Sequence, residues 1–198
     1  AELPRLAQPL CPRCALPSPG GATCGRCLVE PPHYDATFAA LAYVFPADAL
    51  VHALKFGGEL PLALLLGGLI AQRIASSERV DCVIAVPLSA ARLRERGYNQ
   101  AIELARPASK AAHARLDLGA CLRERDTAAQ SDLPWAQRRR NVRGAFRCTR
   151  ALAEARVAVV DDVMTTGATL DEIAATLKRA GAAHVVNWVL ARTFPPDA

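Results

Sequence analysis

Long apolar runs and the common nucleotide-binding motifs are both missing from this sequence of 198 residues. No run approaches the roughly 20 apolar residues of a membrane span, and no secretory signal pattern opens the sequence. The motifs G-x-x-x-x-G-K-[ST] and G-x-G-x-x-G do not occur either. Aromatic residues make up only 5%, so we expect a core built mainly from Leu, Val, Ala and Ile. The sequence therefore offers no membrane span and neither of these two phosphate-binding loops.

Neither sign of charge dominates strongly. The 24 Lys and Arg residues exceed the 19 Asp and Glu residues, which gives a net charge of +5. This balance favours anionic ligands, but it is too small to establish nucleic-acid binding by itself. With 52% hydrophobic residues, the chain fits one domain of ordinary size with a small appendage.

Cysteine, in contrast, is well represented. Four of the seven cysteines form two C-x-x-C pairs, joined by a short segment rich in Pro and Gly that must turn back tightly. Two such pairs facing each other supply the four thiolates that zinc binds tetrahedrally, and a segment so poor in apolar residues needs a metal to hold a fold. The expected ligands of this structural zinc are Cys11, Cys14, Cys24 and Cys27. A redox dithiol and cysteines that bind nothing are the alternatives.

The cysteine pattern also predicts a location and a boundary. C-x-x-C pairs indicate metal binding in a reducing compartment, so we expect a cytoplasmic protein. The pair Pro31-Pro32 ends the cysteine-rich part, and His33 reads as a linker residue. We therefore divide the chain into a zinc-binding module, residues 1–32, and a main domain, residues 33–198.

The main domain contains one run that combines a buried strand with polar chemistry. Residues 157–160 are apolar and β-prone, and Asp161 and Asp162 follow them directly. A short Thr/Gly segment comes next, and a helical pattern continues through Ile173 and Leu177. A fully apolar run of this kind is typical of a strand in a parallel sheet, and the turn after it lies where α/β folds bind ligands.

The Thr/Gly segment has the composition of an anion site. Backbone N–H groups at a helix N-terminus, a glycine and three threonine hydroxyls suit a phosphate monoester. Two carboxylates would repel a phosphate, but they suit sugar hydroxyls or a divalent cation. A ribose 5-phosphate satisfies both halves, with the phosphate on Thr165, Thr166, Gly167, Ala168 and Thr169. The alternative is a capped helix after a strand, with solvated acids.

A second apolar strand, residues 81–87, leads into a loop with three arginines. Because this loop follows a central strand, Arg92, Arg94 and Arg96 are placed to meet a second anion. A solvated basic helix start is the alternative. Lys55, beside a Gly pair, either reaches a ligand phosphate or extends along the surface.

The remaining pattern completes an α/β arrangement. Residues 1–10 are expected to be poorly ordered or draped on the surface. Expected strands cover 37–45, 116–122, 145–148 and 184–190, and expected helices cover 47–55, 61–76 and 98–105. The Leu/Ala-rich helix 61–76 is expected to be buried all round.

The least regular part, residues 123–143, is polar and strongly basic. Its candidates for nucleic-acid contact are Trp135, Arg138, Arg139, Arg140 and Arg143. Arginines contact phosphates and a tryptophan stacks on bases, which suits single-stranded DNA. The alternative is a lid over a ligand site, with ordinary surface arginines.

The run through the two acids resembles the phosphoribosyl-pyrophosphate (PRPP) signature of type I phosphoribosyltransferases. That resemblance implies a mainly parallel central sheet flanked by helices. It assigns Asp161 and Asp162 to the ribose hydroxyls, the Thr/Gly segment to the 5-phosphate, and the arginine loop to the pyrophosphate of PRPP bound with Mg²⁺.

Three further pieces narrow the resemblance. The paired C-x-x-C motifs, the segment R-G-Y-N-Q at 96–100 and the segment R-R-N-V-R-G-A-F at 139–146 together resemble the ComF family of competence proteins. That family is linked to natural transformation, in which it acts inside the cell on incoming single-stranded DNA with other competence proteins. Two functions follow as hypotheses: phosphoribosyl transfer from PRPP to an unknown acceptor, or non-catalytic DNA binding with the PRPP site as an anchor or sensor.

Overall fold

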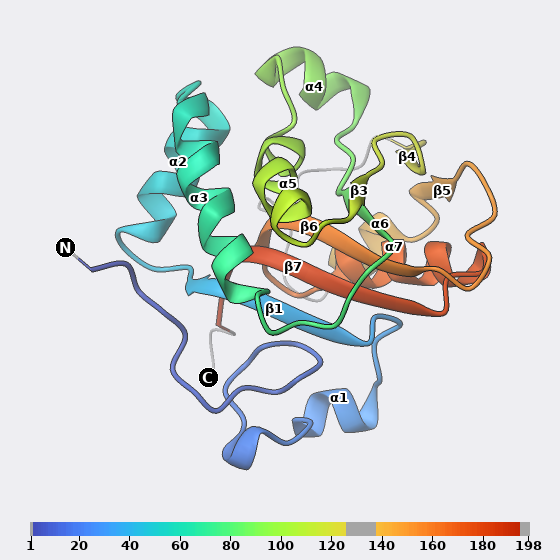
Figure 1. Ribbon diagram of the computed structural model, residues 1–198, viewed down its shortest axis with the longest axis horizontal. Helices are drawn as coiled ribbons and strands as arrows, with labels where there is room; N and C mark the ends of the chain where they lie inside the picture. Colours follow the sequence, from blue (N-terminus) through green and yellow to red (C-terminus); the bar gives the residue numbers. More distant parts are fainter. Residues whose placement is uncertain (1, 126–137, 195–198) are drawn as a thin grey trace.

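A five-stranded parallel sheet forms the centre of the computed structural model, which describes residues 2–125 and 138–194 (Figure 1). The strand order is β1-β7-β6-β2-β3, and every neighbouring pair is parallel. The strands are β1 (Ala36–Ala42), β2 (Cys82–Ala85), β3 (Arg115–Leu116), β6 (Arg156–Met164) and β7 (His184–Arg192). The predicted α/β architecture with a mainly parallel central sheet is confirmed.

Helices cover both faces of this sheet. The crossovers from β1 to β2 and from β2 to β3 run in one direction along the strand order, whereas the crossover from β6 to β7 runs in the other. Crossovers between parallel strands are almost always right-handed. The helices of the first two crossovers therefore lie on one face and the helix of the third on the opposite face. The first face carries α2 (Ala47–Phe56), α3 (Leu60–Arg73) and α5 (Gln100–Ala111), and the second carries α7 (Ala168–Arg179). The shorter helices are α1 (Gly25–Val29), α4 (Ala90–Arg96) and α6 (Arg138–Val142), with a 3-10 turn at Pro19–Gly21.

Helices α3 and α5 approach each other closely because α3 contains a glycine at the crossing. A methyl group on Gly67 would collide with the ring of Pro107 and would lie 2.8 Å from the carbonyl oxygen of Leu104. Apart from this contact face, α3 is less buried than its composition suggests. Leu64 and Leu65 are 73% and 58% exposed, so the expectation of a helix buried all round is wrong. Among the helices of the described residues, none has the length and apolarity needed to cross a membrane.

The expected strand 116–122 is also wrong, because the chain turns in its middle. The carboxylate of Asp117 accepts hydrogen bonds from the N–H groups of Gly119 and Ala120 and ends β3 there. The chain then enters β4 (Cys121–Arg123), which pairs antiparallel with β5 (Phe146–Cys148) in a separate ribbon. This ribbon brings the two sides of the basic segment together, since Arg123 pairs with Phe146.

The N-terminal segment packs against the edge of the sheet. Leu6 and Leu10 are buried, and the carbonyl oxygen of Pro4 accepts a hydrogen bond from the N–H of Ala42. In Figure 1 this segment and α1 lie below the sheet, on the opposite side from α3. Of the two arrangements expected for residues 1–10, the structure therefore shows a chain that lies along the domain and contributes to its core.

Candidate ligand and metal sites

The two acids lie inside the end of β6 and point into different surroundings. The strand continues through them to Met164, and successive side chains of a strand face opposite ways. Asp162 is buried: its Oδ1 lies 3.0 Å from Nζ of Lys55, and its Oδ2 accepts a hydrogen bond of 2.8 Å from Nε2 of Gln100. Asp161 accepts the N–H of Asp162 at 2.9 Å and otherwise faces a cavity. The carboxylate of Asp162 is thus already partnered, and that of Asp161 is open to a ligand.

The electrostatics of Asp161 differ from those of an exposed acid. Burial, followed by the charge of the neighbouring Asp162, raises the pKa of Asp161 to about 7, although Lys55 opposes this rise. A carboxylate with such a pKa is only partly ionised at neutral pH in the free protein. A cation or a hydroxyl donor placed against it would favour the ionised form.

The Thr/Gly loop, residues 165–169, connects β6 to α7 in the expected place. Gly167 caps α7 with φ +84°, a backbone conformation that favours glycine. A methyl group there would also lie 2.8 Å from Cε of Met164 and 3.0 Å from the hydroxyl of Tyr34. The hydroxyl of Thr166 accepts the N–H of Ala168 at 3.1 Å, which fixes the shape of the turn.

A cavity of about 510 Å³ opens over the end of β6, and we call it the ligand cavity. Both acids and all five residues of the Thr/Gly loop line it, so the structure brings these predicted residues together. Four cationic side chains also line it among the described residues: Lys55, Arg92, Arg96 and Arg123. Because these outnumber the two carboxylates, the cavity suits a ligand with more than one negative charge.

Of the three arginines predicted to bind an anion, only two line the ligand cavity. They lie on a helix, α4, which Ser89 caps by accepting the N–H of Arg92, and not in an extended loop. Arg92 and Arg96 line the ligand cavity, whereas Arg94 on the same helix does not. The guanidinium of Arg96 stacks over the ring of Phe56, 4.8 Å from its centre. The alternative of a basic helix start was therefore right about the local structure, and two of its arginines nevertheless reach the site.

Several lining residues carried no local signal in the sequence. Tyr43, His52 and Phe56 line the ligand cavity, and the His52 and Phe56 rings lie 4.8 Å apart. Gln100 opens α5 and bonds a residue 62 positions away. Its place in the R-G-Y-N-Q segment was the only hint, and that hint came from family resemblance.

The four cysteines of the two C-x-x-C pairs form one cluster. Their Sγ atoms all lie within 4.8 Å of one another, and those of Cys14 and Cys24 are 3.6 Å apart. Tetrahedral zinc with bonds of about 2.3 Å places its sulfurs about 3.8 Å apart, so the cluster fits such an ion. Burial, together with the charge of Cys11, raises the pKa of Cys14 to about 11. Four thiolates in such surroundings need a dication, so these residues could hold a metal ion.

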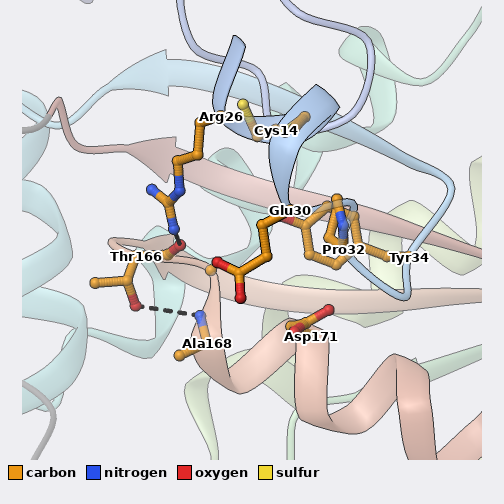
Figure 2. Close-up of a pocket in the computed structure, with 10 residues that line it drawn as sticks. Cys14, Arg26, Glu30, Pro32, Tyr34, Thr166, Ala168 and Asp171 are labelled. Atoms are coloured by element: carbon orange, nitrogen blue, oxygen red, sulfur yellow. Dashed lines mark hydrogen bonds between the residues drawn. The ribbon is translucent and has the colours of Figure 1, made fainter. Parts of the chain in front are cut away.

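His33 lies apart from the cysteine cluster. Its backbone N–H and Nδ1 lie 2.6 and 3.1 Å from Oδ1 of Asp171 in α7, which joins the end of the cysteine segment to the main domain. A second cavity, of about 190 Å³, lies beside this junction (Figure 2). Arg26 and Tyr34 line it from the N-terminal side, and Thr166 and Gly167 line it from the loop side.

The nucleic-acid candidates lie on and around α6. Arg138, Arg139 and Arg140 open this helix, and Arg140 and Arg143 are exposed. The carbonyl oxygen of Arg143 accepts a hydrogen bond of 2.7 Å from Nη2 of Arg125. Trp135 lies outside the described residues. Arg123, the last residue of β4 and the first of the basic segment, lines the ligand cavity.

Sequence comparison identifies relatives along most of the chain. No protein-family model matches it. DNA utilization protein YhgH of Escherichia coli O6:H1 is 40% identical over 197 residues, which cover 96% of this chain and 87% of the relative. Competence protein F of Haemophilus influenzae is 32% identical over 182 residues, which cover 85% of this chain and 78% of the relative. The chain belongs to the ComF family. The resemblance noted in the sequence is thereby confirmed.

This member of the ComF family also aligns with solved structures. Glutamine PRPP amidotransferase from B. subtilis is 25% identical, and the alignment covers 65% of this chain and 26% of that protein with a TM-score of 0.45. A purine phosphoribosyltransferase from Pyrococcus horikoshii is 18% identical, and the alignment covers 68% of this chain and 74% of that protein with a TM-score of 0.39.

Proposed function

We propose that the chain binds PRPP, or another ribose 5-phosphate, together with Mg²⁺ in the ligand cavity, and that it acts in natural competence and DNA uptake. One observation supports this choice of ligand. A cavity of about 510 Å³ at the end of a central parallel strand is lined by an open carboxylate, a Thr/Gly loop and several cations. The names of the relatives, DNA utilization protein and competence protein, support the biological setting. A reducing compartment such as the cytoplasm suits seven unpaired cysteines.

The ligand roles divide along the cavity. The amides and hydroxyls of Thr165, Thr166, Gly167, Ala168 and Thr169 hold the 5-phosphate at the start of α7. Asp161 accepts the ribose hydroxyls, since its carboxylate faces the cavity. Asp162 holds Lys55 and Gln100 in place, and it contributes to ribose binding through that position.

The pyrophosphate end lies toward α4. Arg92 and Arg96 contact this group, and Arg94 strengthens the positive field from outside the cavity. Bound Mg²⁺ supplies the charge that stabilises a departing pyrophosphate. The reaction such a site supports is phosphoribosyl transfer, with the arginines neutralising the leaving group and Asp161 keeping the ribose still. The four-cysteine cluster holds a structural zinc ion, because four thiolates leave no open position for chemistry.

Calorimetry with PRPP and Mg²⁺ tests this proposal. Asp161→Asn should weaken binding at least tenfold, since hydrogen bonds to a charged partner contribute about 1.5–3 kcal/mol each. Asp48→Asn on α2 is the control, because Asp48 does not line the ligand cavity. Equal affinities of the parent and Asp161→Asn would remove this carboxylate from the site. A screen for pyrophosphate release with nucleobases then separates a transferase from a protein that only binds.

A second candidate function is single-stranded DNA binding by the basic segment, and the exposed arginines of α6 favour it. We expect affinity to fall steeply with salt concentration. The variant Arg140→Gln should flatten the plot of log affinity against log salt by about 0.7 if it removes one phosphate contact. If the slope is unchanged in both Arg140→Gln and Arg143→Gln, these arginines do not contact DNA phosphates. That result would favour the alternative, in which the segment is a lid over the ligand cavity.

A further inference from the structure

A buried arginine joins the cysteine cluster to the Thr/Gly loop. Arg192 ends β7 and has no exposed surface. Its Nε donates a hydrogen bond of 2.8 Å to the carbonyl oxygen of Cys14, inside the first C-x-x-C pair. Its Nη1 donates to the carbonyl oxygens of Met164, at 2.9 Å, and of Thr165. One side chain therefore bonds both the metal-ligand segment and the backbone that leaves β6 toward the ligand cavity.

Among the described residues, no carboxylate pairs with the charge of Arg192. No acidic side chain lies within ion-pair distance of it in residues 2–125 and 138–194, and its Nη2 is buried without a hydrogen-bond partner there. An isolated buried guanidinium is strongly unfavourable, so a counter-charge must lie close by. Four thiolates around one Zn²⁺ carry a net charge of about −2. The cysteine cluster, whose Cys14 carbonyl Arg192 already contacts, is the group that can supply this counter-charge.

A second arginine makes a parallel connection. Arg26 stands between the two cysteines of the second C-x-x-C pair, and its Nη2 donates a hydrogen bond of 3.1 Å to the carbonyl oxygen of Thr166 (Figure 2). The cavity of about 190 Å³ lies beside this bond and is lined by residues of both the cysteine segment and the loop.

These bonds determine where the loop amides point. In a trans peptide the C=O of one residue and the N–H of the next point in opposite directions. Arg192 and Arg26 hold the carbonyls of Thr165 and Thr166 on the cysteine side, and Arg192 shares that of Met164 with the N–H of Thr193. The N–H groups of the same three peptides, which belong to residues 165–167, are thereby directed away from the cysteine side, as a phosphate bound in the ligand cavity requires.

We propose that the metal cluster and the Thr/Gly loop are coupled through Arg192, with Arg26 as a second link, so that zinc binding preorganises the phosphate-binding amides. Arg192 is a positioning residue in this scheme, since it acts on the ligand through the loop. The inference rests on the proposed ribose 5-phosphate site for its functional consequence, but the coupling itself is a property of the ligand-free protein. Because coupling is reciprocal, a ligand on the loop must also strengthen zinc binding by the same factor.

The first test needs no ligand. Hydrogen exchange is measured in zinc-loaded protein and after removal of zinc by a chelator, at the amides of Ala168 and Asp171, which donate hydrogen bonds to Oγ1 of Thr166 and to the carbonyl oxygen of Gly167 and so depend on the loop conformation. We expect exchange there to accelerate at least tenfold on zinc removal, while the amides of β2 keep their protection. Accelerated exchange confined to residues 11–27, with the loop unchanged, would overturn the coupling.

The second test uses variants that keep the zinc ligands. Arg26→Gln and Arg13→Gln change the equivalent position of the two C-x-x-C pairs, but Arg13 donates to the carbonyl oxygen of Tyr34 and not to the loop. In zinc-loaded protein, loop exchange should accelerate in Arg26→Gln and in Arg192→Lys, which keeps the charge but loses the planar fork. Arg13→Gln should match the parent. Loop exchange at the parent's rate in Arg26→Gln and Arg192→Lys, as in Arg13→Gln, would refute the links assigned to Arg26 and Arg192.

Ribose 5-phosphate then connects the coupling to function. Its affinity should fall about tenfold when zinc is removed, and its presence should raise the affinity for zinc about tenfold, measured at equilibrium by competition with the chelator. Equal binding with and without zinc would overturn the coupling and leave the proposed function standing. No binding to zinc-loaded protein would instead contradict the proposed function, and the exchange measurements would still decide whether the cluster orders the loop.

Discussion

Replacing Asp161 by asparagine should stabilise the ligand-free protein, and increasingly so as the pH rises. Burial and the charge of Asp162 raise the pKa of Asp161 from 3.8 to about 7 in the folded state. The folded protein therefore holds this proton more tightly than the unfolded chain does. The stabilisation that this provides is complete below about pH 4 and is lost as the pH rises through 7. Asparagine keeps the oxygen that accepts the N–H of Asp162 but carries no charge.

The magnitude follows from the same pKa difference. One pKa unit corresponds to about 1.4 kcal/mol, so a fully enclosed carboxylate would lose about 4 kcal/mol between pH 4 and pH 8. Asp161 faces the ligand cavity, where water screens its charge, and we therefore expect about half of that. Asp161→Asn should exceed the parent in free energy of unfolding by about 2 kcal/mol at pH 8, and by about a third of that at pH 5.

Urea unfolding at pH 5 and pH 8 measures both quantities. Asp48→Asn serves as the control and should show no comparable change with pH. Adding PRPP and Mg²⁺ at pH 8 should reduce the difference in free energy of unfolding between Asp161→Asn and the parent, because ligand binding stabilises the parent more than the variant. An Asp161→Asn protein that is less stable than the parent at pH 8 would refute this account of the carboxylate.

Two further substitutions probe the scaffold of the site. Lys55→Met should lower the free energy of unfolding by about 2 kcal/mol, because it leaves the buried carboxylate of Asp162 without its cation, whereas the exposed control Lys110→Met should change it by less than about 0.5 kcal/mol. Gly67→Ala should destabilise by about 1–3 kcal/mol because the new methyl group forces α3 and α5 apart, and Gly68→Ala, with open space around it, should be neutral or slightly stabilising. Chemical denaturation of the four proteins measures both effects, and equal stabilities within either pair would contradict the packing described here.

The features that the sequence predicted well are those encoded in short stretches. The run from Val157 to Asp162 shows a buried strand and its polar end within six residues, and β6 occupies that place. The spacing of the two C-x-x-C pairs likewise predicts a site with four sulfurs, and their four sulfurs form one cluster. Each of these signals depends on neighbours in the chain, which a sequence displays directly.

The features that were missed depend on contacts between distant residues. Arg192 follows an apolar strand and shows no sign that its guanidinium meets Cys14, 178 positions away. Gln100 looks like an ordinary first residue of a helix until Asp162 is placed beside it. The exposure of Leu64 was misjudged because a uniformly apolar helix has no periodicity that marks its outer face.

The most direct test of the central claim is the structure of the protein crystallised with PRPP and Mg²⁺. We expect the 5-phosphate to accept hydrogen bonds of about 2.7–3.2 Å from amides of residues 165–169, with the ribose hydroxyls against Asp161 and the pyrophosphate toward Arg92 and Arg96. Density for PRPP away from this loop, or a ligand cavity that stays free of it at concentrations where calorimetry shows binding, would contradict the assignment of this cavity as the ribose-phosphate site.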